Sequence, residues 1–425
     1  MKKWYLAQII FFSLFFSISG VHAKPQNTHW GLQQIRDSLS IVKKFEKTNK
    51  PDTRLSDLLV ASNNKHQLII YDTTKSTVIF RSKSSDTLIT RPLVSSNKQF
   101  AYFINQDGWL SQFDLQQLST TRRIRVGLKP RTLALSADDR YLIIAKKHPP
   151  SFVILDSQTL KPLVFKTLNN NKGTTTHIRA IIGAPTRESF VAGIDQTNNG
   201  KTTRQIWEII HKDNPLPVYN GPMHDYRMGE GIAKQPHEFP VRKIPVNDCT
   251  LHNNKDCIND WMVYSPTGFL IMHCAKHLNV WQLDARRQIA EMDLEILPKL
   301  SSAIIWNNKQ NLILAIPAQD KAKISIINAS QWKKIKTIKT KGIAKLITSQ
   351  QNSDYLWLAI QQEHTNSVIQ VMDKNTLNII KTINFTSSNS PIAFIQFDNV
   401  GKQVFVGLEN EKLMHFSASG VKKSE

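Results

Sequence analysis

The sequence predicts an all-β protein, an eight-bladed β-propeller with seven blades as the alternative, and a short N-terminal helix after a signal peptide. One observation is a recurring apolar run that ends on an acid or amide before a turn, as in Ile154-Leu155-Asp156. Another is the spacing, because Asp72, Asp114 and Asp156 are separated by equal intervals. Propeller blades repeat every roughly 40–45 residues and contain four strands each. Both observations therefore favour the propeller.

The stretch Lys129–Pro162 shows what one repeat contains. Its short apolar runs, Leu133–Leu135, Tyr141–Ala145 and Phe152–Leu155, are separated by turn-forming residues, and a fourth run, Leu163–Phe165, follows. Short β-rich runs joined by turns indicate an antiparallel meander. Counting the repeated runs gives eight blades. Seven stays open because the first repeat lacks a clear innermost strand and the last lacks an outer one.

Residues 1–23 are typical of a cleavable secretory signal peptide. Lys2 and Lys3 precede an apolar stretch, Trp4–Ile18, and small residues precede Lys24. This arrangement is that of a signal peptide, and the stretch is shorter than the roughly 20 apolar residues that a membrane span needs. We therefore expect an exported, periplasmic protein with no transmembrane segment in its mature form.

Two further segments complete the predicted domain organisation. Residues 24–50 have apolar side chains at helical spacing, including Ile35 and Leu39, and predict an amphipathic helix that packs on the main domain. The propeller is predicted to span residues 51–425. Its repeat is interrupted once, by an insertion loop at about residues 211–259 that is rich in Pro, Gly, His and charged residues. Loops of this length are usually functional or disordered.

The formal net charge of +22 favours an anionic partner. A polycarboxylate ligand, lipid head groups and nucleic acid all satisfy that charge, and lysines scattered over turns also suit an ordinary solvated surface. We expect a small anionic ligand and no nucleic acid.

Three cysteines allow one internal disulfide, which we expect between Cys249 and Cys257 at the base of the insertion. Cys274 lies in an apolar strand and is expected to be buried. The sequence contains no Cys-x-x-Cys-His motif for covalent haem.

Propeller geometry predicts a ligand face. Residues that approach the innermost strands lie at the same end as the turns between second and third strands. The first group comprises Arg91, Lys129, Arg131, His177, Arg179 and Lys345, and the second comprises Asn105, Gln106, His148, His277 and His364. Guanidinium groups bind carboxylates in a bidentate manner, so this face suits a ligand with several carboxylates. The alternative is that turn residues are polar everywhere.

No metal site or catalytic residue is predicted. His273, Cys274 and His277 are close in sequence, but alternation along a strand sends the first two to opposite faces. No phosphate-binding loop, nucleophile elbow or carboxylate pair stands out. The catalytic residues, if there are any, are therefore unknown from sequence.

Several segments resemble the d1 domain of cytochrome cd1 nitrite reductase and its relatives, nearest to the haem d1 biosynthesis protein NirF. The most specific segment begins His148-Pro149-Pro150 and continues to Pro162, with Asp156-Ser157-Gln158-Thr159-Leu160 inside it. Arg179 is similar to an arginine of that family one blade later. Pro240–Pro245, which contains Arg242, and Gly342–Thr376 are similar to segments of NirF. The resemblance covers about residues 55–420.

The resemblance implies a periplasmic eight-bladed propeller that binds haem d1 or a tetrapyrrole precursor non-covalently, for its maturation or delivery. The implied ligand-binding residues are Arg91, Arg131, His148, His177, Arg179, Arg242, His277 and His364. The family's iron-ligand histidine is missing from the segment Thr87–Pro92, which makes His148, His177 and His277 the candidates. Nitrite reductase activity is not expected. The alternative function is a noncatalytic scaffold for a protein or an anionic cell-envelope partner.

Overall fold

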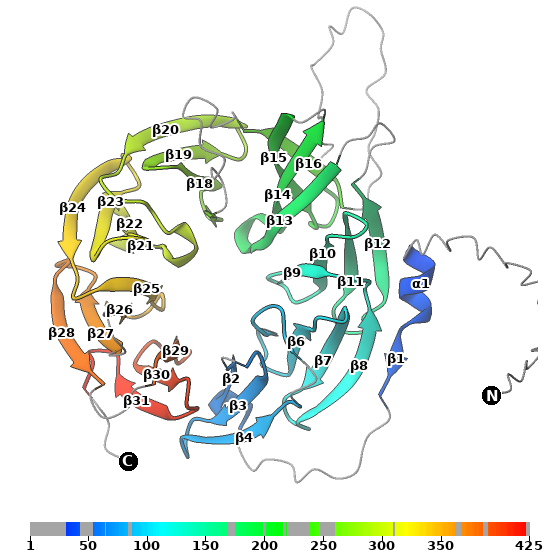
Figure 1. Ribbon diagram of the computed structural model, residues 1–425, viewed down its shortest axis with the longest axis horizontal. Helices are drawn as coiled ribbons and strands as arrows, with labels where there is room; N and C mark the ends of the chain where they lie inside the picture. The colour runs from blue at the N-terminus through cyan, green and yellow to red at the C-terminus, as the bar shows by residue number, and fades with distance from the viewer. Residues whose placement is uncertain are drawn as a thin grey trace, which may run out of the picture.

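Eight antiparallel sheets stand around a common axis (Figure 1). The structure is a computed structural model that describes residues 31–42, 54–63, 65–83, 87–168, 175–198, 201–215, 218, 239–246, 260–308, 311–361, 367–385 and 390–421. The eight-bladed propeller is confirmed. The predicted signal peptide, residues 1–23, lies outside the described residues.

The first four blades follow one another along the chain, each with its strands in sequence order. Blade 1 contains β2 (Leu58–Ser62), β3 (Leu68–Asp72) and β4 (Thr77–Arg81). Blade 2 contains β5 (Leu93–Val94), β6 (Phe100–Ile104), β7 (Trp109–Asp114) and β8 (Ser119–Arg125). Blade 3 contains β9 (Pro130–Leu135), β10 (Tyr141–Lys146), β11 (Ser151–Asp156) and β12 (Pro162–Thr167). Blade 4 contains β13 (Thr175–Ala184), β14 (Ser189–Asn198), β15 (Lys201–Ile210) and β16 (Val241–Pro245).

The last four blades continue the same arrangement. Blade 5 contains β17 (Trp261–Tyr264), β18 (Phe269–Cys274), β19 (His277–Gln282) and β20 (Arg287–Asp293). Blade 6 contains β21 (Ile304–Asn308), β22 (Asn311–Pro317), β23 (Lys323–Asn328) and β24 (Lys333–Lys339). Blade 7 contains β25 (Ile343–Thr348), β26 (Tyr355–Gln361), β27 (Ser367–Asp373) and β28 (Ile379–Asn384). Blade 8 contains β29 (Ile392–Phe397), β30 (Gln403–Leu408) and β31 (Leu413–Ser417).

In several blades, the acid or amide that ends the repeated strand holds the next turn. Asp72 accepts a hydrogen bond from the backbone N–H of Thr74 (2.9 Å), and Asp156 accepts one from Thr159 (2.7 Å). Asn328 does the same for Ser330. Carboxylate and amide side chains commonly stabilise turns in this way. The sequence marker thus has a local physical cause.

Blades 1 and 8 have three strands each in the described part of the chain. They are joined by side-chain packing, because Leu59 and Tyr71 of blade 1 lie in one apolar cluster with Phe405 and Leu413 of blade 8. Similar clusters fill the spaces between the other neighbouring blades. The core is therefore divided into wedges between blades.

The N-terminal helix is shorter than predicted. Helix α1 spans Leu32–Asp37, and strand β1 (Ser40–Ile41) then pairs with the outer edge of β8. The Ser38 hydroxyl accepts a hydrogen bond from the Arg125 N–H (2.8 Å), which ties the helix end to blade 2. Ile35 is fully buried between blades 2 and 3. The chain then leaves the helix to pair with the free edge of β8.

The predicted insertion is not one continuous loop. Strand β16 lies inside it and completes blade 4 by pairing with β15. Most of the remaining insertion, including Cys249 and Cys257, lies outside the described residues. The sequence period missed β16 because a long segment separates it from β15.

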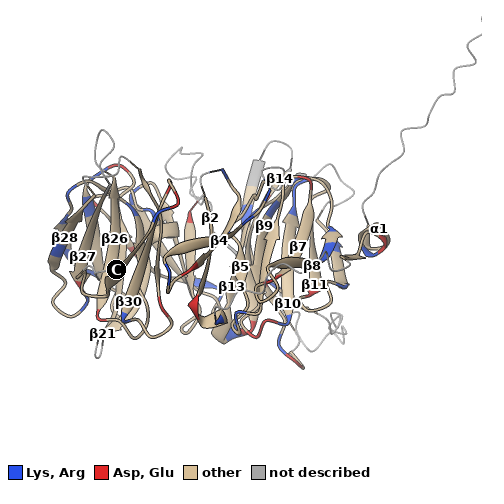
Figure 2. Ribbon diagram, turned by 90° about the horizontal axis from the view of Figure 1, so that it is seen from below, with Lys and Arg blue, Asp and Glu red and all other residues tan. Residues whose placement is uncertain are grey.

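Each blade runs between two ends of the ring, as the side view in Figure 2 shows. At one end lie the turns between second and third strands and the segments that approach the innermost strands. We call it the basic face, defined by Arg91, Lys129, Arg131, Arg179, Lys299 and Lys345. The other end, with the turns between first and second and between third and fourth strands, is the opposite face.

Candidate functional site

Four innermost strands have a β-bulge where they reach the basic face, and three of them carry a basic residue there, whereas β29 has Ala393. In β9 the register slips at Arg131. In β25 it slips at Lys345. In β13 it slips at Arg179 and Ala180, which together lie opposite Gly193. A bulge adds one residue without a ladder partner and changes the direction of its side chain, and bulges are frequent beside binding sites. Basic residues therefore occupy three such positions around the axis.

The cations of the basic face differ in how they are paired. Arg91, which precedes β5, is exposed, as are Arg131 and Lys345. Among the described residues their side chains make no ion pair. Arg131 and Lys345 were both identified from sequence by the approach to an innermost strand, and the structure confirms their placement at one end of the ring.

Arg179 belongs to a three-residue charge cluster inside blade 4. Its guanidinium donates to the Asp195 carboxylate, whose side chain is 9% exposed. Arg204 approaches the other oxygen of Asp195 (Nε to Oδ1, 3.7 Å). Arg204, on a third strand, was not predicted from sequence.

The predicted histidines lie at the same end of the ring where the structure describes them. His148 is exposed in the β10–β11 turn, and His177 is half-buried in β13. Desolvation and the nearby positive charges of Lys129, Lys147 and His177 lower the pKa of His148. A lowered pKa keeps its imidazole neutral, the form that ligates metals.

The other two histidines are less informative. His277 is half-buried at the start of β19. His364 lies outside the described residues, so its predicted role stays a prediction.

Lys299 was missed from sequence and lies among the basic-face cations. It precedes the 3-10 helix η5 (Leu300–Ser302), on the approach to blade 6. Burial and the positive charges of Lys345 and Arg91 lower the pKa of Lys299, while Asp260 raises it. The rule that identified Lys345 would have found Lys299, had the approach to blade 6 been extended back over η5.

His273 and Asp260 each have a buried polar atom without a hydrogen-bond partner in the described structure. These atoms are His273 Nε2 and Asp260 Oδ2. The other ring nitrogen, Nδ1, lies 3.1 Å from the Ala275 carbonyl oxygen, so Nδ1–H donates there and Nε2 keeps its lone pair. Burial lowers the pKa of His273, which favours the neutral ring. A buried acceptor without a partner is typical of sites that receive a ligand or a water molecule.

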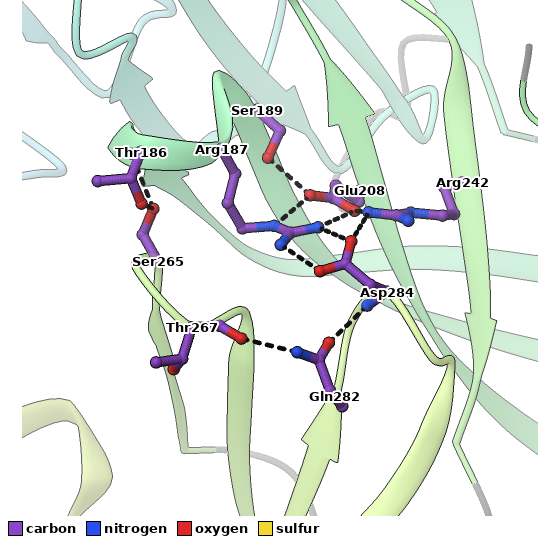
Figure 3. A network of polar contacts seen from close by, with 9 residues as sticks. All are labelled: Thr186, Arg187, Ser189, Glu208, Arg242, Ser265, Thr267, Gln282 and Asp284. Atoms are coloured by element: carbon purple, nitrogen blue, oxygen red, sulfur yellow. Dashed lines mark hydrogen bonds and ion pairs between the residues drawn. The ribbon is translucent and has the colours of Figure 1, made fainter. Parts of the chain in front are cut away.

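Arg242, which the family resemblance assigned to the ligand, lies away from the basic face. It lies in β16 and pairs with Glu208 near the end of β15, at the opposite face. Figure 3 shows Arg242 and Arg187 converging on Glu208 and Asp284. Arg187 donates to Glu208 (2.7 Å) and to Asp284 (2.7 Å). We call these four residues the clasp.

The clasp joins blade 4 to blade 5. Glu208 is 1% exposed and also accepts a hydrogen bond from the Ser189 hydroxyl (2.9 Å). Burial alone would raise the pKa of Glu208, but Arg187 and Arg242 outweigh it and lower the pKa. The clasp pairs two guanidinium groups with two carboxylates, and Arg286 lies near enough for its charge to act on Glu208 and Arg242. Arg242 is therefore engaged in holding the two blades together.

A single lysine is buried between blades 2 and 3 near the basic face. Lys146 is 1% exposed, and its ammonium group has no hydrogen-bond partner in the described structure. It lies 4.6 Å from the centre of the Phe165 ring. Burial lowers its pKa to about 8. A glycine at position 127 leaves room for it, since a Cβ there would lie 3.0 Å from its Nζ.

Two observations bear on metals and cysteines. No group of three or more His, Cys, Asp or Glu residues is arranged to hold a metal ion in the described ranges. Cys274 is 4% exposed and packs with Trp281, as a small buried apolar residue would. In the same part of the chain, no helix is long and apolar enough to cross a membrane.

Comparison with known families matches the model of the cytochrome D1 heme domain at residues 54–243 and 260–422. The chain belongs to this family. The expected resemblance to the d1-domain propellers is thereby confirmed, and the chain is a haem d1-related propeller. A closer likeness to NirF stays a prediction.

One relative and two solved structures place the chain further. Dihydro-heme d1 dehydrogenase of Pseudomonas aeruginosa is 25% identical over 369 residues, which are 84% of this chain and 66% of that protein. The match therefore spans slightly less than two thirds of that relative. The structure described as dihydro-heme d1 dehydrogenase NirN in complex with DHE has a TM-score of 0.75 at 22% identity, over 94% of this chain and 80% of that one. BamB from Moraxella catarrhalis has a TM-score of 0.52 at 10% identity, over 89% and 96%. Both structures show the propeller fold.

Proposed function

We propose that this protein binds haem d1 or its dihydro precursor non-covalently on the basic face, for maturation or delivery of the cofactor. The observation that carries the proposal is the placement of Arg131, Arg179 and Lys345 on bulges of three innermost strands. Haem d1 has several carboxylates, and guanidinium and ammonium groups are their natural partners. The names of the relatives support the same ligand class.

The residues present fit such a ligand. Arg91, Arg131 and Lys345 are exposed and would pair with its carboxylates. The lowered pKa of His148 favours its neutral imidazole, and His177 is half-buried at the same end. In the described structure, His273 has a buried ring nitrogen without a hydrogen-bond partner. The bound group would supply a redox-active iron inside the macrocycle. The chain's residues would orient the macrocycle, neutralise its carboxylates and offer imidazole nitrogens to the metal.

The decisive experiment is a titration of the purified protein with haem d1 and with its dihydro form, followed by absorbance. We expect a spectral shift that saturates at micromolar protein. The double variant Arg131→Gln, Arg179→Gln should weaken binding by about tenfold or more, since each lost charged hydrogen bond is worth roughly 1.5–3 kcal/mol. The control Lys333→Gln, Lys339→Gln removes equal charge from the outer strand β24.

The absence of any spectral shift with either ligand would refute the proposal. The remaining candidate would then be a noncatalytic scaffold for a protein or an anionic cell-envelope partner. Equal weakening by the control variant would instead mean that overall charge, and not the basic face, attracts the ligand.

We also propose that the protein acts in the periplasm after removal of residues 1–23. The basic start and apolar stretch of this segment support export. Cell fractionation should place the mature chain in the periplasmic fraction, and its N-terminal residue should be Lys24. An unprocessed chain in the cytoplasmic fraction would contradict export.

A further inference from the structure

A second group of cations lies across the axis from Arg131 and Arg179. Its centre is the bulge of β25 at Lys345. The carbonyl oxygen of Lys345 accepts a hydrogen bond from Lys299 Nζ (2.7 Å) and another from the Ser302 hydroxyl (3.1 Å). These bonds fix the bulge against η5 and hold the two lysines beside each other. Figure 1 shows β25 on the opposite side of the axis from β9 and β13.

The group carries an excess of positive charge. Arg91, from blade 2, is near enough to Lys299 for its charge to act on that lysine. Among the described residues, Asp260 is the one carboxylate that acts on Lys299, and its Oδ1 already accepts the Ser301 N–H (2.6 Å). In this part of the structure, three cations therefore meet one carboxylate. An ammonium group has three donors, so Lys299 keeps two after bonding the Lys345 carbonyl.

Placing like charges together is unfavourable unless an anion joins them. The hydrogen bonds from Lys299 and Ser302 to the Lys345 carbonyl hold the cations together although their charges repel. This arrangement points to an anionic ligand that binds between them. Phosphate or sulfate would satisfy the charge as well as a carboxylate would. The position opposite Arg131 and Arg179 favours carboxylates of one ligand that reaches both groups.

We propose that Lys299 and Lys345 form a second carboxylate subsite, toward which Arg91 reaches from blade 2, so that the basic face selects tetrapyrroles with carboxylates on opposite edges. This inference rests on the proposed function, because it assumes that one tetrapyrrole occupies the face. It adds a specificity rule. A macrocycle with carboxylates on neighbouring rings alone would satisfy one group of cations and leave the other unpaired.

The test compares two iron-free porphyrins by fluorescence titration. Coproporphyrin III has a propionate on every ring, whereas mesoporphyrin IX has propionates on two neighbouring rings. Wild-type protein should bind coproporphyrin at least about tenfold more tightly, since an additional charged pair is worth that much. Lys345→Gln should remove most of this preference and change mesoporphyrin binding by less than about twofold.

Lys345→Gln is the chosen variant because the structure uses only the backbone carbonyl of this residue, which the substitution keeps. Lys299→Gln serves as a second variant, with circular dichroism to check its fold. Lys333→Gln on β24 is the control for lost charge. Equal affinity of wild-type protein for both porphyrins, or an unchanged preference in both variants, would overturn the subsite. Phosphate that competes equally with both porphyrins would also overturn it.

The outcomes separate this inference from the proposed function. If haem d1 binds but Lys345→Gln and Lys299→Gln leave its affinity unchanged, the subsite fails and the function stands. If haem d1 and its dihydro form do not bind, yet coproporphyrin shows the expected preference, the function fails and the carboxylate subsite stands.

Discussion

Blade 4 carries an arginine pair at each of its ends, and the two pairs differ in how exposed they are to solvent. At the opposite face, Arg187 and Arg242 share Glu208 and Asp284, and their side chains are 13% and 16% exposed. At the basic face, Arg179 and Arg204 meet at Asp195, and the side chain of Arg179 is 32% exposed. The clasp arginines are therefore largely closed off from a ligand, whereas Arg179 stays accessible to one.

Lys146 extends the comparison to a cation that meets no carboxylate among the described residues. It is as buried as Glu208 of the clasp, and its ammonium group lies over the Phe165 ring. A desolvated charge without an opposite charge is destabilising. The three sites therefore run from a buried ion-pair network through a partly exposed one to a buried charge without a described ion pair.

The largest effect is expected from Glu208→Gln in the clasp. Removing the buried partner of this network leaves Arg187 and Arg242 with the exposed Asp284 as their remaining clasp carboxylate, which costs about 3–5 kcal/mol of unfolding free energy. Urea unfolding at pH 7 measures this loss. Arg179→Gln is the matched control at the basic face and should cost less than about 1 kcal/mol, because its side chain is 32% exposed and Arg204 still pairs with Asp195.

Equal losses of stability in the two variants would contradict the larger structural role of the clasp. Binding of the ligand should show the reverse order, since Arg179→Gln weakens it and folded Glu208→Gln protein binds normally. A clasp variant that is stable but does not bind would place the clasp in the binding machinery.

The fold was predictable because its repeat has a local cause. In several blades a carboxylate or amide at the end of the repeated strand caps the next turn, so Asp72 and Asp156 mark their blades in the sequence itself. The helix was predicted too long because the spacing of Leu39 fits a helix, whereas the free edge of β8 that recruits Ser40–Ile41 is a distant partner. Local pattern cannot show a distant edge.

The candidate site was predictable only in part, for a similar reason. Blade geometry places Arg131 and Lys345 correctly, because the approach to an innermost strand is a property of the repeat. Arg242 was predicted to bind the ligand from the family resemblance. Its partners lie on β15 and in the β19–β20 turn, and only the folded chain brings them together. Lys299 was missed because η5 interrupts the approach to blade 6.

The second effect in size concerns Lys146→Met. Burial holds the pKa of this lysine at about 8, below its ordinary value of 10.5. Both the folded and unfolded forms are protonated below pH 8, so the folded state bears the full cost of the buried charge there. Replacing the lysine should therefore raise the unfolding free energy at pH 7 by about 3 kcal/mol.

The pH dependence separates charge from packing. In wild-type protein, stability should rise as the pH increases from 8 to 10.5, because the folded state loses its proton first. The Lys146→Met variant should lack this component of the rise. A variant less stable than wild type at pH 7 would mean that another group stabilises the charged ammonium of Lys146.

The smallest effect is expected from Asp284→Asn at the exposed edge of the clasp. Hydrogen bonds from Arg187 hold the pKa of Asp284 at about 2, below its ordinary value of 3.8. Its contribution is therefore present above pH 3.8 and is lost as the pH falls through 2. Because its side chain is 58% exposed, solvent screens the pair, and we expect a loss of about 0.5 kcal/mol at pH 7.

Urea unfolding of wild type and Asp284→Asn between pH 2 and pH 7 measures that contribution. The difference between the two proteins should shrink toward zero at pH 2, where the carboxyl group is largely protonated in both the folded and the unfolded form. Glu208 responds in the same direction, but it is present in both proteins and cancels in the difference. A loss at pH 7 as large as that of Glu208→Gln would mean that the exposed carboxylate matters as much as the buried one. In that case, burial would not explain why the clasp contributes to stability.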